Sequence, residues 1–351
     1  MSASNPGCQT QLLANVFILV GPGGVQSDLH IVDMECYNTF GNIWGLYLGR
    51  QAYLLLTDTE IIHKVFVEDN GKIFASAKTH RSKCPVSESF FQPDNDDWRR
   101  IHQILAPAFG PTQLRQKCGS YLQYLLDHEE TKMEKGKKSL PTSATLTEDE
   151  VVAQAVGFLL RAYQMATHTL EFVAYLLARH PSVQHQLQQE VHTAIKQQGF
   201  TYENIAGMEY LDMVVMETLR LFPPVVWLQR TCQKLVEVCD LKISRGIQVT
   251  VPVWVMHHSR EFWDHPCRFD PLRFTREERD LRDPVCYLPF GLGAFSCIGS
   301  EFSVMMVKVA LASILTRYRF TWCSQTPMYL DIETLGVTRS KIPITLQIEL
   351  L

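Results

Sequence analysis

A proline-free stretch from residue 147 to about Ala178 constrains the fold more than any other feature of the chain. Residues 147–150 (Thr-Glu-Asp-Glu) have the spacing of a capping box, in which the first and last side chains satisfy each other's backbone N–H groups at a helix start. His180 and Pro181 end the stretch, and Pro181 suits the first position of a following helix over Ser182–Gln198. At 1.5 Å per residue the first helix is roughly 45 Å long, so it must cross the whole domain.

Three regions outside this helix have the short apolar runs and turn residues of β-hairpins. The first pairs Ile43–Leu48 with Ala52–Leu56, the second lies within 236–255 with its turn at 244–246, and the third lies within 329–350. Residues 57–60 have capping-box spacing and predict a short helix through Val67. The sequence therefore predicts a mainly α protein with small β-sheets.

Composition bounds the class of the protein. The 351 residues are 46% hydrophobic and 20% charged, which is typical of soluble globular proteins of one large or two modest domains. A net charge of −4 without a long basic run excludes a general affinity for nucleic acid. Ten cysteines without a C-x-x-C pair favour free thiols in a reduced compartment over disulfides or a zinc site.

The N-terminal segment contains one apolar run, Leu12–Val20, which is interrupted by Asn15 and followed by Gly21-Pro22-Gly23-Gly24. The run is too short for a bilayer core of about 30 Å and lacks the basic leading segment of a signal peptide. We therefore expect residues 1–30 to form a segment without a spanning helix.

A glycine-rich loop with one cysteine, Phe290–Gly299, leads into an apolar helix predicted over Phe302–Leu315. Its glycines allow the backbone to pass close to a flat ligand, and N–H groups at a helix start lower the pKa of a nearby thiol. Cys297 therefore fits an axial thiolate ligand, although a buried free cysteine in a turn is the commoner role of a lone cysteine.

The spacing Phe-x-x-Gly-x-x-x-Cys-x-Gly of this loop resembles the haem-binding loop of the cytochrome P-450 family. Glu217-Thr218-Leu219-Arg220 and Phe269–Phe274 precede it in that family's order, and the resemblance runs from residue 33 to the C-terminus. It is strongest toward the clan that contains the microsomal drug-oxidising enzymes and thromboxane synthase. The resemblance implies a cytochrome P-450 fold around haem b, with Cys297 as the iron ligand and catalytic thiolate. It implies that four further loop residues contact the cofactor: Phe290, Gly291, Gly293 and Gly299.

Glu217 and Arg220 lie three residues apart on a predicted helix and can pair. Such pairs usually lie on a solvated face, but here the neighbouring residues are apolar nearly all round the helix, which predicts a buried pair. The resemblance adds Arg273 and implies a structural charge network of these three residues.

The resemblance also implies cations for the two haem propionates. Trp98 and His102 match a W-x-x-x-R motif, with histidine in place of arginine, and Arg230 matches another propionate-binding position. Phe295 stands where the family has a basic residue. Each charge-assisted hydrogen bond contributes about 1.5–3 kcal/mol, so these changes predict looser haem binding.

The long helix carries Gln164 and Met165 where the family has an acid and a hydroxyl that handle protons during dioxygen activation. Glutamine cannot ionise and methionine cannot donate a proton. Thr167 turns away from the face of Met165, and Thr169 lies one turn along that face. The resemblance implies that Gln164 and Met165 occupy these catalytic positions. An apolar residue at the second position is also found in thromboxane synthase, which rearranges a peroxide.

Residues 127–146 are polar and lysine-rich, which indicates a linker. Family members have helices there that roof the substrate pocket. The resemblance therefore implies a truncated form, with a deletion near 128–146 in a haem-thiolate domain of residues 31–351. This deletion predicts an open haem face or uncovered apolar surface on the long helix.

Three functions are compatible with these residues. The first is a haem-thiolate monooxygenase that oxidises an apolar lipid, steroid or xenobiotic with dioxygen and electrons from an NADPH-dependent reductase. It would act at the endoplasmic reticulum membrane by resemblance, without an anchor in this chain. The second is an isomerase of a fatty-acid endoperoxide, and the third is a non-enzymatic or defective truncated product.

Overall fold

The computed structural model describes residues 28–69, 73–76, 95–109, 125–128, 145–334 and 336–351, without the side chains of 95–99. The apolar run Leu12–Val20, nearly all of the segment 1–30 and most of the linker, 129–144, lie outside the described residues. The long helix is confirmed as α6, Glu148–Arg179. Both bonds of its capping box are present, because Thr147 Oγ1 accepts from the Glu150 N–H and the Glu150 carboxylate accepts from the Thr147 N–H.

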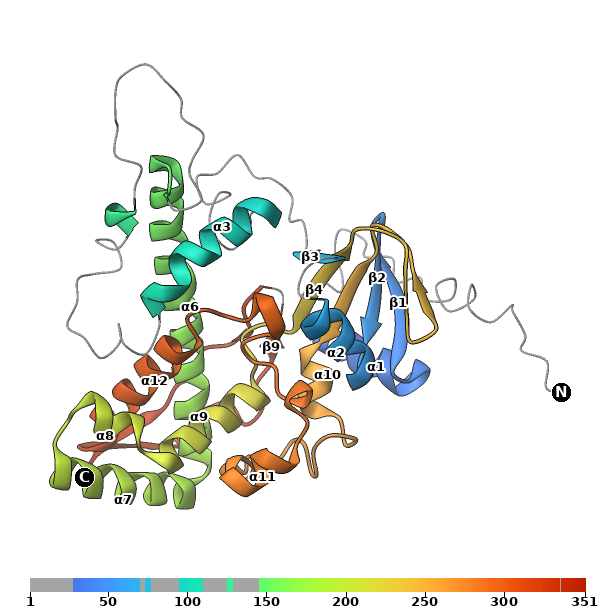
Figure 1. Ribbon diagram of the computed structural model, residues 1–351. Coiled ribbons are helices and arrows are strands. Elements are labelled where there is room, and N and C mark those ends of the chain that lie inside the picture. Colours follow the sequence, from blue (N-terminus) through green and yellow to red (C-terminus); the bar gives the residue numbers. More distant parts are fainter. Residues whose placement is uncertain (1–27, 70–72, 77–94, 110–124, 129–144, 335) are drawn as a thin grey trace.

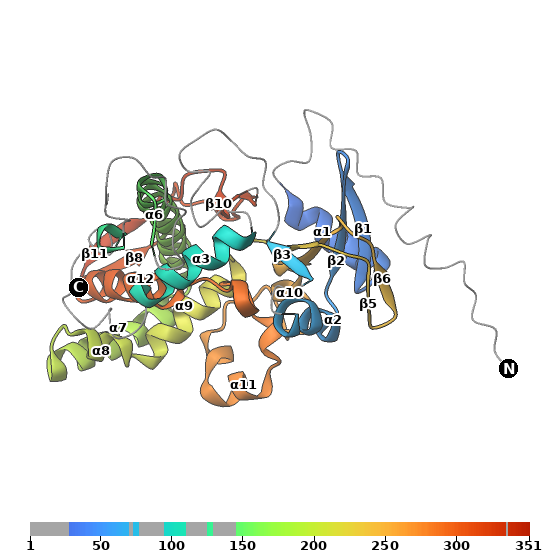
Figure 2. The ribbon, with the colours of Figure 1, turned by 45° about the horizontal axis from the view of Figure 1, so that its top comes forward.

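Helices on one side of the molecule pack around α6 (Figure 1). They are α7 (Pro181–Gln198), α9 (Glu209–Leu221) and α12 (Ser300–Leu315), and α8 (Tyr202–Ala206) packs against α12 and α7. Apolar side chains of α6, α7, α9 and α12 form the largest core cluster. Figure 2 shows this helical group on one side and the main sheet on the other.

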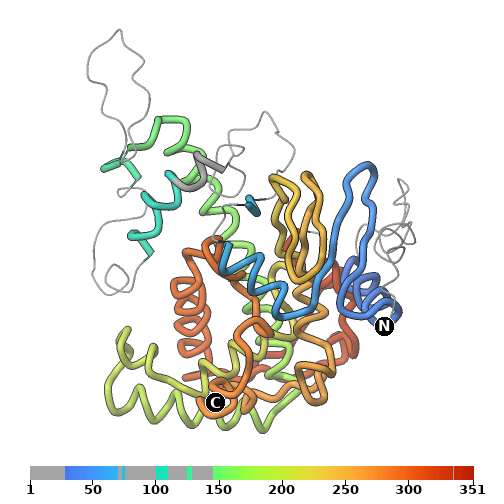
Figure 3. Tube along the Cα trace, turned by 45° about the vertical axis from the view of Figure 1, so that its right-hand side comes forward, coloured from blue at the N-terminus to red at the C-terminus, as the bar shows by residue number. Residues whose placement is uncertain are grey.

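The main sheet has five strands in the order β1-β2-β7-β4-β3. The predicted hairpin is confirmed as β1 (Ile43–Leu48) and β2 (Gln51–Leu56), and the other strands are β3 (Phe74–Ser76), β4 (Trp227–Cys232) and β7 (Gln248–Pro252). Only the β2–β7 pair is parallel. Figure 3 shows the blue hairpin beside the gold strands, although these segments lie far apart in the sequence. A second apolar core lies against this sheet.

Further helices of the described residues lie outside this group. They are α1 (Leu29–Phe40), α2 (Thr59–His63) with a π-helical continuation over Lys64–Glu68, α3 (Asn95–Leu105) with a 3₁₀ turn over Ala106–Phe109, α10 (Val253–His258) and α11 (Arg276–Leu281). Three short 3₁₀ helices cover Pro271–Phe274, Pro284–Cys286 and Gly293–Phe295. Arg100 of α3 pairs with Glu150 and so joins α3 to the first turn of α6. The mainly α class with small sheets is confirmed.

Two predicted hairpins differ from the observed pairing. The pair β5 (Val236–Val238) and β6 (Leu241–Ile243) turns at Cys239 and Asp240, not at 244–246, because both central residues have the positive φ of a type I′ turn. Gly246, with φ of +88°, instead leads the chain into β7. Residues 329–350 form no single hairpin: β9 (Ile332–Glu333) pairs with β10 (Arg339–Ser340), and β11 (Gln347–Leu350) pairs with β8 (Tyr318–Thr321).

The N-terminal half of α6 carries uncovered apolar side chains. Leu159 and Tyr163 are 69% and 70% exposed, and Val152 and Leu160 are also exposed. Uncovered surface on this helix is one of the two consequences expected of missing roof helices. Among the described residues, no helix has both the length and the apolar character needed to cross a bilayer.

Candidate functional site

A cavity of about 270 Å³ opens between α6 and the loop that leads into α12. This volume lies near the lower end of the roughly 300–1,000 Å³ typical of small-molecule sites. Its walls come from α6, α9, β4, the loop and the first turns of α12, and most of the lining residues are apolar. Among the residues selected from the sequence, the cavity brings together Met165, Arg230, Phe290, Gly291 and Cys297.

The cysteine loop, Phe290–Gly299, is closed by a hydrogen bond of 2.8 Å from the Cys297 N–H to the Phe290 carbonyl oxygen. Gly291 and Gly293 have φ of +79° and +70°, a region that favours glycine. A Cβ atom on Gly293 would lie 1.9 Å from the carbonyl oxygen of Phe66. Gly293 is therefore required by the packing of the loop on the π-helical segment 64–68.

The predicted fall in the pKa of Cys297 is wrong. The surrounding protein raises the pKa of this thiol by desolvation, and the hydrogen bond with the Gly299 backbone, which lowers it, is the smaller effect. Solvent still reaches Cys297 through the open side of the cavity. A thiolate at this position therefore needs a metal or another cation to hold it in the charged form.

The α6 wall of the cavity has no free hydroxyl at the position of Met165. Met165 and Thr169 line the cavity, whereas Gln164 is exposed and lies outside the lining. The Thr169 hydroxyl donates to the Met165 carbonyl oxygen at 2.8 Å. The Thr167 hydroxyl donates to the Tyr163 carbonyl oxygen on the exposed side of the helix. The Thr169 hydroxyl, which lines this wall, is therefore engaged with the helix backbone.

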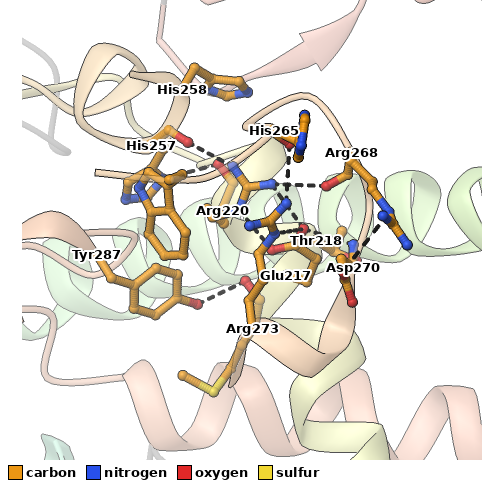
Figure 4. Close-up of polar contacts among 12 residues, drawn as sticks. Glu217, Thr218, Arg220, His257, His258, His265, Arg268, Asp270, Arg273 and Tyr287 are labelled. Carbon is orange, nitrogen blue, oxygen red and sulfur yellow. Dashed lines mark hydrogen bonds and ion pairs between the residues drawn. The ribbon is translucent and has the colours of Figure 1, made fainter. Parts of the chain in front are cut away.

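The Glu217–Arg220 pair lies behind the cavity and is fully buried, which confirms the burial that the apolar helix predicts (Figure 4). Arg220 Nε and Nη2 donate to the two carboxylate oxygens of Glu217 at 2.7 and 2.8 Å. Arg273 Nε lies 3.5 Å from Glu217 Oε1, a charge contact without hydrogen-bond geometry. Burial raises the pKa of Glu217, and the bonds and charges of the two arginines oppose this rise. The three residues form one buried network.

Comparison with known proteins gives the family. The profile of the family described as Cytochrome P-450 matches residues 6–128 and 111–348, which is most of the chain. The chain belongs to the cytochrome P-450 family. It is 26% identical to cytochrome P-450 3A12 of dog (Canis lupus familiaris) and to cytochrome P-450 3A29 of pig (Sus scrofa), over 93% of this chain and 88% of each relative. Human cytochrome P-450 3A5 (Homo sapiens) is also 26% identical, over 90% of this chain and 86% of the relative.

This membership makes the protein an oxidoreductase of the monooxygenase class. The family is a haem family, and haem is a flat, largely apolar cofactor that carries two carboxylates.

Arg230 provides a cation on the cavity wall. Its side chain is only 8% exposed, and its guanidinium lies 4.8 Å from the ring centre of Phe66 and 4.1 Å from that of Phe295. It donates to the Gln229 carbonyl oxygen, and within the described residues it forms no ion pair with an acidic side chain. Burial lowers its pKa to about 9. A buried cation held by two rings, beside a thiol and apolar walls, fits a haem with an anionic propionate.

Phe295 stands where the family has a basic residue that contacts a haem propionate. In the structure, its ring packs against Arg230. The resemblance also assigns His102 and Trp98 to the propionates. His102 is half-buried on α3, burial lowers its pKa, and it lies outside the cavity lining. The Trp98 side chain lies outside the described residues. Gly299 is the N-cap of α12 with φ of −94° and does not line the cavity.

Sequence reasoning missed His257, a fully buried histidine at the end of α10. Its ring and its carbonyl oxygen both contact Arg220, and its ring also contacts the segment before the cysteine loop. The sequence signal was a histidine directly after the apolar run Val251–Met256, because this position predicts burial and a buried imidazole requires hydrogen-bond partners.

Proposed function

We propose that the protein is a haem-thiolate monooxygenase that oxidises an apolar organic substrate (lipid, steroid or xenobiotic) with dioxygen. The observation that carries this proposal is the shared cavity, in which the Cys297 thiol and the Arg230 cation lie among apolar walls. Arg230 has no acidic partner among the described residues. Cys297 would hold haem b by its iron, and Arg230, with His102 and Trp98, would hold the propionates. Bound haem would supply the redox-active iron, with electron density from the Cys297 thiolate.

The other residues of the site support this assignment by position. Phe290, Gly291, Gly293 and Gly299 would shape the loop around the cofactor, and the Glu217–Arg220–Arg273 network would anchor it from behind. Because Met165 faces the cavity without a donor hydrogen and Gln164 cannot ionise, this chain would deliver protons slowly. The apolar walls would bind the substrate and limit the entry of water.

We also propose that electrons come from an NADPH-dependent reductase and that the protein acts at the endoplasmic reticulum membrane. Both proposals are drawn from the kind of protein named among its relatives.

We propose that a segment near 128–146 is deleted from the domain of residues 31–351. The alignment with the dog relative covers 443 positions, more than the 351 residues of this chain, so that relative has segments without a counterpart here. The two stretches that match the family profile overlap at 111–128, next to the proposed deletion.

The test of the haem-thiolate assignment is spectroscopic. Reduced, carbon monoxide-bound protein should show the red-shifted Soret band of a thiolate adduct, and Cys297→Ser should abolish that band. Cys267→Ser is the control, because Cys267 is exposed and lies outside the cavity. A normal band in the Cys297→Ser protein would exclude Cys297 as the ligand. Protein that never retains haem would favour the defective-product alternative.

A second candidate function is the rearrangement of a fatty-acid endoperoxide. The observation that favours it is the α6 wall, where Met165 carries no hydroxyl and the Thr169 hydroxyl is bound to the backbone. A peroxide substrate already contains its O–O bond and needs no proton relay from water. Consumption of NADPH with product formation would support the monooxygenase, whereas conversion of an endoperoxide without NADPH would support the isomerase.

A further inference from the structure

His257 joins three segments of the chain through hydrogen bonds that involve its backbone and its ring. Its carbonyl oxygen accepts from Arg220 Nη1 at 2.7 Å, and its Nδ1 lies 3.0 Å from the Arg220 carbonyl oxygen. Its Nε2 lies 2.8 Å from the backbone nitrogen of Leu288. The side chain is 0% exposed, so no water competes for these positions.

The partners fix the tautomer of this ring. The Leu288 backbone can only donate, so Nε2 of His257 must be the acceptor. The hydrogen is then on Nδ1, which donates to the Arg220 carbonyl oxygen. A protonated ring would have a second N–H directed at the Leu288 N–H. The geometry therefore requires a neutral imidazole with both nitrogens engaged. Figure 4 shows His257 beside Arg220.

Leu288 connects this ring to the cysteine loop. Its carbonyl oxygen accepts from the Gly291 N–H at 3.2 Å, and Phe290, in the same turn, accepts from the Cys297 N–H at 2.8 Å. The Leu288 side chain is buried in the core beneath the sheet. A continuous series of hydrogen bonds therefore runs from the Glu217–Arg220 pair through His257 to the turn that holds Cys297.

We propose that His257 is a positioning residue that fixes the cysteine loop against the Glu217–Arg220 pair, so that Cys297 binds haem as a thiolate. The inference rests on the proposed haem-thiolate function and adds a residue to it. His257 is not a catalytic residue, because the cavity lining does not include it.

The two contacts of the His257 ring can be tested one at a time by substitution with Asn or Gln, because the amide groups of these side chains lie at different distances from the backbone. Asn in place of His257 has its amide near the position of Nδ1, so it can keep the bond to Arg220 but stops short of Leu288. Gln reaches the position of Nε2 and can accept from the Leu288 N–H. The matched control is His258→Asn, because His258 is the next residue, stacks on Trp254 and bonds to the Trp254 carbonyl oxygen, away from the loop.

The experiment compares these three variants with the unaltered protein, all loaded with haem and reduced under carbon monoxide. The readout is the fraction of bound haem that gives the thiolate-type Soret band, as opposed to the band of a neutral thiol adduct. We expect His257→Asn to lose most of the thiolate-type band, and His257→Gln and His258→Asn to retain it. Equal thiolate fractions in His257→Asn and His257→Gln at equal haem content would overturn the inference.

A second measurement does not depend on the folding of a variant. Hydrogen exchange of the unaltered holoprotein should show the Leu288 amide to be as protected as the Cys297 amide, and rapid exchange at Leu288 would overturn the inference.

The haem-thiolate function and the role of His257 would fail in different ways. Absence of a thiolate-type band in the unaltered protein would remove the haem-thiolate function and this inference together, whereas a band that is insensitive to His257→Asn would remove this inference alone.

Discussion

Two buried arginines, Arg220 and Arg230, have opposite surroundings. Arg220 is 0% exposed, and its guanidinium bonds to both oxygens of Glu217 and to the His257 carbonyl oxygen. Arg230 is 8% exposed, and its guanidinium contacts one backbone carbonyl and the rings of Phe66 and Phe295. The first charge is paired with a carboxylate, whereas the second has no acidic partner among the described residues.

This difference separates scaffold from binding site. Removing a charge from water costs several kcal/mol unless an opposite charge and hydrogen bonds compensate for it. Glu217 compensates for Arg220 whether or not a ligand is bound. Arg230 lines the cavity, and among the described residues its charge is compensated by one backbone carbonyl and two rings without a carboxylate, so an anionic ligand has the most to gain there.

The largest expected effect is the loss of the compensated pair. Arg220→Ala leaves the buried Glu217 carboxylate without its main partner and should cost about 3–5 kcal/mol, a large part of the 5–15 kcal/mol typical of a folded protein. We expect insoluble or haem-free protein. The control is Arg268→Ala, because the Arg268 side chain is 71% exposed and its closest acidic oxygen, on Asp270, is 3.9 Å away. Soluble, haem-loaded Arg220→Ala protein would contradict the role given to this network.

The next effect concerns the α6 wall of the cavity. Gln164→Glu with Met165→Thr restores an acid and a hydroxyl, and general acid–base help is typically worth 100- to 10,000-fold. Product formation driven by the reductase should rise toward that range, while peroxide-driven rearrangement should change little. Thr167→Val is the control, because the Thr167 hydroxyl binds the helix backbone on the exposed side. An unchanged reductase-driven rate at intact haem content would refute the proton-relay argument.

Local signals predicted the scaffold well. A capping box predicted the start of α6, and short apolar runs on either side of a turn predicted the β1–β2 hairpin. The apolar surface of the surrounding helix predicted the burial of Glu217 with Arg220. Each of these signals comes from residues close together in the sequence. The family motif predicted part of the cavity lining, because Met165, Arg230 and Cys297 line it, whereas Gln164, His102 and Gly299 do not.

Contacts between distant residues were not predictable in this way. The rings of Phe66 and Phe295 meet at Arg230, and the His257 ring meets Leu288, only after the fold is formed. The pKa of Cys297 shows the same limit. The helix start is visible in the sequence, whereas the stronger desolvation comes from atoms that the tertiary structure brings near the thiol.

A buried carboxyl group on α1 extends the comparison. Asp33 is 0% exposed and accepts a hydrogen bond from Trp227 Nε1 on one oxygen, and its other oxygen has no partner among the described residues. Burial raises its pKa from 3.8 to about 7, against the smaller effect of the Trp227 bond. Between these values the folded state keeps a proton that the unfolded chain releases. The stability that Asp33 contributes is therefore present at low pH and is lost as the pH rises to about 7.

Asp33→Asn tests this sign, because asparagine resembles the protonated acid. Relative to the unaltered protein, the variant should gain up to about 1.4 kcal/mol of unfolding free energy per pH unit across that window, and nothing further above it. Chemical denaturation at several pH values within and above the window gives the difference. Glu35→Gln, an exposed position on the same helix, should show no such trend. A pH-independent difference for Asp33→Asn would mean that the carboxyl is ionised throughout.

The smallest expected effect, and the one that decides the comparison, comes from Arg230→Met. Methionine keeps the apolar stem of the side chain between Phe66 and Phe295 but removes the uncompensated charge, so the apoprotein should be as stable as the unaltered apoprotein or more stable. Haem affinity should fall, because the bond to a propionate contributes about 1.5–3 kcal/mol, or roughly 10- to 150-fold. Denaturation of the haem-free protein and haem titration measure the two effects separately. Arg220→Ala lowers stability first and haem content as a consequence, whereas Arg230→Met should separate the two. If Arg230→Met instead destabilised the apoprotein by as much as Arg220→Ala, Arg230 would belong to the scaffold, and the cavity would need another cation for its ligand.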